Sequence, residues 1–203
     1  MINETGATIS FLAILKGFKG TIQEVSAALT DNIRAYRVQN QIKILEKTKL
    51  LCSEKNIQPN VVPNRILAPL LQEASFEDNE ELQSRWAALL ANSIDDPNII
   101  HPCYINILKQ LTSAEAKLID TIYDDIILYE KDGIGREDIK NLVEINDAKS
   151  IEIIINNLIR LGLLEFHLYK NPNQTGKGID ILAGNVNQFV LTELGRGFVR
   201  VCK

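Results

Sequence analysis

Residues 66–111 determine the fold of the first half of the chain; they read ILAPLLQEASFEDNEELQSRWAALLANSIDDPNIIHPCYINILKQL. Its pattern predicts a helix, an acidic turn, a capped helix, a short loop and a third helix. Asp78 and Glu81 stand three residues apart just before an apolar run, which is the capping-box pattern of a helix start. The run that follows has the i, i+4, i+7, i+8 spacing of one buried helical stripe ending near Ser93; its members are Leu82, Trp86, Leu89 and Leu90. The segment therefore has a packing role, and we expect Trp86 to lie in the core.

Helix boundaries on both sides of this segment can also be predicted. Thr30, Asp31 or Asn32 is a suitable cap for a helix that runs to about Lys55. The stretch NIQPNVVPN, residues 56–64, then breaks the chain, and Pro63 can open the next helix because the N–H that proline lacks has no helical partner there. His101 before Pro102 marks the start of the third helix.

The same part of the chain resembles the bacterial abortive-infection alpha family. The resemblance covers roughly residues 32–120 and is carried by DNIRAYRVQNQIKILEKTKLLC, APLLQEASFEDNEELQSRWAALLAN and HPCYINILKQLTSAEAKLID. It implies a role in defence against phage. It brings no catalytic motif with it.

The second half of the chain predicts a different layout. Thr112 and Glu115 form another capping box, which opens a helix with four apolar residues facing inward; these are Leu118, Ile119, Ile122 and Ile126. A short helix is expected over residues 136–144, and Asp147 is expected to cap a third. Extended segments at residues 163–169, 179–182 and 188–191 would then form a hairpin.

Three short helices followed by a hairpin are the layout of a winged helix. The strings NNLIRLGLLEFHL and FVLTELGRGFVRVC resemble the third-helix exit and the closing segment of winged-helix domains. The predicted fold is therefore mainly α. An amphipathic N-terminal helix (1–31) and a helical abortive-infection-alpha-like domain (32–110) precede a small winged-helix-like α+β domain (111–203).

A winged helix raises the question of DNA binding. In such motifs one helix enters the major groove, and cationic side chains contact phosphates. The candidate DNA-reading residues, mostly in the third helix of this part, are Lys149, Ser150, Asn156, Asn157, Arg160 and Lys177. However, residues 111–203 carry eleven Lys or Arg against fourteen Asp or Glu. This excess of acidic residues favours a protein-interaction domain over one that binds nucleic acid.

Two further surfaces are candidates for interactions. Apolar residues near the N-terminus follow a heptad spacing; they are Phe11, Leu15, Phe18, Ile22, Val25 and Leu29. This stripe can pack on the rest of the protein, associate with another copy, or lie flat on a membrane surface through residues 9–29. Residues 1–60 are net basic. The basic helix that bears Arg34, Arg37 and Lys43 is either solvated, an anion-binding site, or an internal partner of the acidic turn at residues 77–81.

Composition limits the remaining possibilities. The chain has 203 residues, 45% hydrophobic and 24% charged, with a net charge of −4, as in ordinary globular proteins. Cys52, Cys103 and Cys202 are odd in number and far apart, which indicates a reduced, cytoplasmic location. We predict no cofactor or metal site, and we interpret His101 as a structural residue.

The function predicted from these observations is phage defence through protein or membrane-surface interactions, with a protein partner or self-association. The alternative is a winged-helix DNA-binding transcriptional regulator. Enzyme activity is the least favoured class, because the chain has no phosphate-binding loop, nucleophile elbow or metal-binding helix motif.

Overall fold

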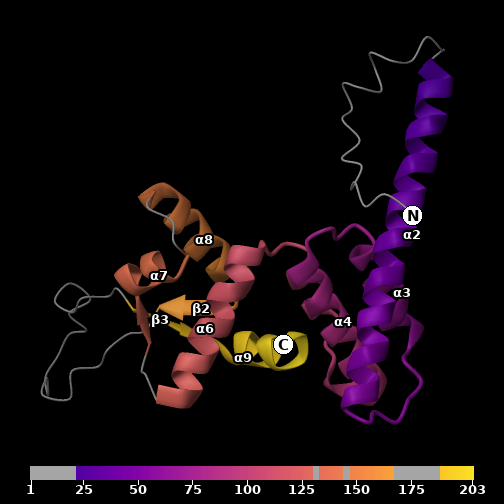
Figure 1. The fold of residues 1–203 in the computed structure, drawn as a ribbon. Helices are drawn as coiled ribbons and strands as arrows, with labels where there is room; N and C mark the ends of the chain where they lie inside the picture. Colours follow the sequence, from indigo (N-terminus) through magenta and orange to yellow (C-terminus); the bar gives the residue numbers. More distant parts are fainter. Residues whose placement is uncertain (1–21, 130–132, 144–146, 167–187) are drawn as a thin grey trace, which may run out of the picture.

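The computed structural model describes residues 22–129, 133–143, 147–166 and 188–203, and its arrangement is mainly helical, as predicted (Figure 1). The first part contains α2 (Ile22–Glu54), α3 (Asn64–Ala74), α4 (Glu80–Asp95), the 3-10 turn η1 (Pro97–Ile99) and α5 (Cys103–Leu108). The second contains α6 (Ser113–Tyr129), β1 (Ile134–Gly135), α7 (Arg136–Val143), α8 (Ala148–Arg160), β2 (Leu164–Phe166), β3 (Gln188–Leu191) and α9 (Glu193–Cys202).

Helix α2 is longer than the sequence pattern predicted. It ends at Glu54, close to the expected Lys55, but the cap expected at Thr30, Asp31 or Asn32 is wrong because the helix runs straight through these residues. Residues 22–54 contain no proline or glycine, so nothing in the backbone interrupts the helix there. Figure 1 shows the N-terminal half of α2 extending beyond the other helices.

The start of α4 is shifted by one residue from the prediction. The cap is Asn79 and not Asp78: Asn79 Oδ1 accepts the N–H groups of Glu81 and Leu82, each at 3.1 Å. The N–H of Asn79 in turn donates to Glu77 Oε1 at 2.9 Å. Asparagine caps helices as well as aspartate does, so the shift costs no stability.

The predicted stripe of α4 is confirmed. The members of the stripe are all buried, and Trp86 has only 1% of its surface exposed. Helix α4 lies at the centre of the molecule, in contact with α2, α3, α5, α6 and α9.

Both caps predicted in the second part are confirmed. The N–H of Thr112 donates to Glu115 Oε2 at 2.7 Å, and the N–H of Glu115 donates to Thr112 Oγ1 at 3.3 Å. Asp147 accepts the N–H groups of Lys149 and Ser150 at 3.3 and 3.0 Å. The hydroxyl of Ser150, which donates to Asp147 Oδ2, and these two N–H groups hold the pKa of the Asp147 carboxyl below its usual range.

The expected order of three helices followed by paired strands is confirmed for the described residues. Strand β3 pairs with β2 and with β1, all antiparallel, in the order β1-β3-β2. The two-residue β1 between α6 and α7 was not predicted. The segment expected at residues 179–182 lies outside the described residues.

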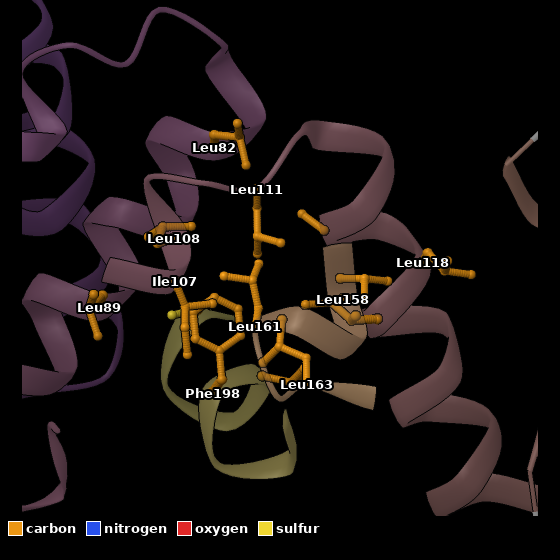
Figure 2. Close-up of a cluster of buried hydrophobic side chains, with 14 of the residues drawn as sticks. Leu82, Leu89, Ile107, Leu108, Leu111, Leu118, Leu158, Leu161, Leu163 and Phe198 are labelled. Atoms are coloured by element: carbon orange, nitrogen blue, oxygen red, sulfur yellow. The ribbon is translucent and has the colours of Figure 1, made fainter. Parts of the chain in front are cut away.

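The two parts share one hydrophobic core. Figure 2 shows Leu82, Leu89 and Leu108 from the first part in the same cluster as Leu158 and Phe198 from the second. The last helix, α9, contacts α4 as well as α6 and β3, and Asn92 Nδ2 donates to Val201 O at 2.9 Å.

Close packing of α9 requires glycine at one position. A Cβ atom at Gly195 would collide with the backbone carbonyl oxygen of Leu163 and lie 3.0 Å from Leu191 Cδ2. Thr192 caps α9 by accepting the N–H of Gly195 at 2.9 Å. The segment TELGRG therefore fixes where the last helix begins and how closely it approaches the sheet.

Candidate interaction sites

The candidate DNA-reading residues on α8 fall into two groups. Asn157 Nδ2 donates to Glu115 Oε1 at 2.8 Å, and Arg160 Nη2 donates to Gln110 Oε1 at 2.9 Å and to Asn157 Oδ1 at 2.6 Å. These bonds join α8 to the start of α6, so both side chains are held by the protein itself.

The other candidates on α8 are near its exposed surface. Ser150 Oγ donates to Asp147 Oδ2 at 2.7 Å as part of the cap, whereas Lys149 and Asn156 are exposed. Ile153 lies between them on the same face and is 67% exposed. Lys177 lies outside the described residues. The structure thus leaves Lys149 and Asn156 exposed, whereas the side chains of Asn157 and Arg160 make hydrogen bonds within the protein.

Asn157 has a structural role that sequence reasoning missed. Its partner Glu115 is only 3% exposed, and a buried carboxylate that loses a hydrogen bond is costly. We expect Asn157→Ala to lower the free energy of unfolding by about 1–3 kcal/mol. Asn156→Ala, one residue away and exposed, should change it by less than about 0.5 kcal/mol. Urea unfolding of both variants measures the difference; equal effects would show that Asn157 does not anchor α8.

The basic residues of α2 also divide into internal and exposed ones. Arg37 Nε donates to Ser75 Oγ at 2.8 Å, and its guanidinium lies 4.3 Å from the centre of the Phe76 ring. Arg34 and Lys43 are exposed, and Arg34 pairs with Asp31 at 3.6 Å on the same helix. Arg37 thus packs inside the protein, but its contacts are Ser75 and Phe76, next to the acidic residues 77–81 and not among them.

A neighbouring lysine joins α2 to the start of α4. Lys47 Nζ donates to Glu80 O and to Ser84 Oγ, both at 2.9 Å. Together with Arg37, it fixes one face of α2 against the turn around residues 75–80.

The N-terminal stripe cannot be placed. Phe11, Leu15 and Phe18 lie outside the described residues, and Ile22 is the first residue of α2, with its side chain outside them too.

A groove that the sequence did not reveal lies where α2, α4, α6 and α9 meet. Its volume is about 520 Å³, and most of the surface that its walls expose is carbon, although several of the lining residues are charged. It is lined by Lys47, Leu50, Leu51, Glu54, Glu81, Ser84, Arg85, Ala88, Asp120, Cys202 and Lys203.

The polar centre of this groove is a buried ion pair. Arg85 Nη1 and Nη2 donate to the two carboxylate oxygens of Asp120 at 3.1 and 2.5 Å, and Nη2 also donates to Ala116 O at 3.1 Å. The side chains are 7% and 21% exposed. Arg85 Nε has no hydrogen-bond partner among the described residues. A paired, two-pronged contact of this kind is rigid and specific.

The groove offers little for covalent chemistry. Burial raises the pKa of the Cys202 thiol far above its usual range, which keeps it protonated and unreactive at neutral pH. In the described part of the chain, no group of three or more His, Cys, Asp or Glu side chains could hold a metal ion.

The outer side of α2 presents apolar residues to solvent. Val38, Ile42 and Leu45 are 48%, 49% and 47% exposed, on the side of the helix away from the buried Asn40 and Ile44. This second stripe was not identified from the sequence. No helix within the described ranges is long and apolar enough to cross a membrane.

The chain matches the model of a known protein family. A family model described as abortive infection alpha matches residues 34–202, which extends the resemblance over both parts of the chain. Comparisons with curated proteins and with solved structures found no match.

Proposed function

Because the chain belongs to the abortive infection alpha family, we propose that it protects bacteria against phage by abortive infection. The proposal includes a cytoplasmic location and action through surfaces that bind other molecules, without an active site of its own. The match over residues 34–202 is the observation that carries it.

Features of the described residues support an interaction role. The groove is lined by apolar side chains and paired charges, and the buried thiol beside it has a raised pKa. The exposed basic residues Arg34 and Lys43 and the outer stripe of α2 remain available to a partner. Such surfaces recognise other molecules without changing them.

We propose the N-terminal stripe as one surface needed for protection. Phe11→Glu combined with Phe18→Glu places charges in the apolar stripe, so it should abolish phage protection together with either self-association or membrane binding. Plaque counts on cells carrying the two forms measure the first effect, and sedimentation and vesicle flotation measure the others.

A control separates this loss from unfolding. The double variant should keep the thermal midpoint of the wild-type protein, because the buried core around Trp86 is left unchanged. A variant that protects as well as the wild type, at the same sedimentation coefficient, would show that the stripe only packs against the protein.

A further inference from the structure

We propose that the outer face of α2 pairs with the same face of a second copy of this chain, in an antiparallel two-fold arrangement. The face is a single row of exposed residues spaced alternately by four and three positions, which is the spacing of a coiled-coil seam. The row consists of Asp31, Ala35, Val38, Ile42, Leu45 and Lys49.

The row lies opposite the side of α2 that packs on the protein. Asn40, Ile44 and Thr48 are buried, and Ile42 and Ile44 point in nearly opposite directions because two helical residues turn by about 200°. Helix α2 is therefore buried on one side and carries apolar residues on its exposed side. An exposed apolar stripe on a helix indicates a contact with another molecule. Figure 1 shows α2 at one edge of the molecule, with its N-terminal half beyond the other helices.

The charges in the row identify the partner as a second copy. The row is symmetric along the helix about the level of residue 40. Val38 and Ile42 lie two residues from this level, Ala35 and Leu45 lie five residues from it, and Asp31 and Lys49 lie nine residues from it. An acidic residue thus closes one end of the apolar stripe and a basic residue closes the other, separated by about 27 Å along the helix.

An antiparallel pairing makes these ends complementary. A two-fold axis that crosses the row at the level of residue 40 places Asp31 opposite Lys49 of the partner subunit. It also places Val38 opposite Ile42 of the partner subunit. A parallel pairing would place Asp31 opposite Asp31 of the partner subunit, and both lysines together at the other end. Since like charges facing each other are unfavourable, the antiparallel arrangement is selected.

The size of the face predicts how strong the association is. A stable interface buries about 800 Å² on each partner, and the four apolar residues of this row are each already partly covered by their own helix. We therefore expect a concentration-dependent equilibrium between monomer and dimer.

The test is an exchange of the two end charges in the full chain. Asp31→Lys alone and Lys49→Asp alone each create two repulsive contacts in a two-fold dimer, so each should raise the dimer dissociation constant by about tenfold. The double variant Asp31→Lys/Lys49→Asp restores opposite charges across the axis and should return the dissociation constant to near that of the wild type. Sedimentation equilibrium measures all four proteins.

Two controls make the result specific. Lys43→Asp reverses a charge on the same helix at an exposed position outside the row, and it should leave the dissociation constant unchanged. Asp31 also pairs with Arg34 of its own helix at 3.6 Å, and that pair is lost in both Asp31→Lys and the double variant, so any restoration must come from across the interface.

The outcomes decide the proposal independently of phage protection. A wild-type chain that stays monomeric at all concentrations would overturn it, as would single variants that dimerise as well as the wild type. Weakened single variants with no recovery in the double variant would overturn the antiparallel register. Plaque counts play no part in this test, so its failure would leave the proposed defence function standing.

Discussion

Replacing Trp86 with alanine is expected to lower the free energy of unfolding by about 3–5 kcal/mol. Trp86 is the largest of the fully buried side chains and belongs to the core that both parts of the molecule share. Its removal would leave a cavity at the centre of α4, which the surrounding helices can fill only in part. Because the stability of a whole protein is about 5–15 kcal/mol, this single change should lower the thermal midpoint strongly.

Trp86→Phe is the matched control. The indole Nε1 has no hydrogen-bond partner among the described residues. Phenylalanine removes this poorly satisfied donor and keeps most of the apolar surface, so it should cost clearly less than alanine. An unchanged midpoint for Trp86→Ala would mean that Trp86 does not support the core.

A second large loss of stability is expected when the buried ion pair of the groove is broken. Asp120→Ala leaves the Arg85 guanidinium, which is 7% exposed, without its main partner. Removing one member of a buried pair costs about 3–5 kcal/mol, and we expect the lower end of this range because the Asp120 side chain is 21% exposed. Chemical denaturation at neutral pH measures the loss.

Asp124→Ala provides a matched comparison on the same helix. Asp124 pairs with Lys203 at 2.5 Å, but these side chains are 47% and 43% exposed. Exposed pairs contribute about 0–1 kcal/mol, so this variant should unfold almost as the wild type does. Similar losses for Asp120→Ala and Asp124→Ala would contradict the assignment of Arg85 and Asp120 as a buried pair.

Local patterns predicted much of the fold. The stripe around Trp86 and the caps at Thr112 and Asp147 were confirmed because each depends on residues within one or two turns of a helix. The error at α4 was of the same local kind: Asp78 and Asn79 are both good caps, and the sequence alone does not choose between adjacent ones.

Contacts between distant segments could not be predicted. Arg85 and Asp120 are 35 residues apart, and nothing in either segment marks the other as its partner. Likewise, the sequence suggested that Asn157 reads DNA bases. Its actual bond to Glu115 could not be predicted, because that bond depends on how α8 packs on α6. Helix α9 could not be predicted from the sequence because it contains Gly195 and Gly197, and glycine disfavours a helix by about 1 kcal/mol. The close contact of Gly195 with Leu163, which requires glycine, exists only in the folded protein.

We propose that this chain limits phage production, and the number of phage released per infected cell is the quantity that should change. Cells that express the intact protein should release far fewer phage than matched cells with an empty vector, and the infected cells should fail to recover. The Trp86→Ala variant, whose core is damaged, should lose this effect. Equal phage release with and without the intact protein, for every phage tested, would rule out the proposed defence function.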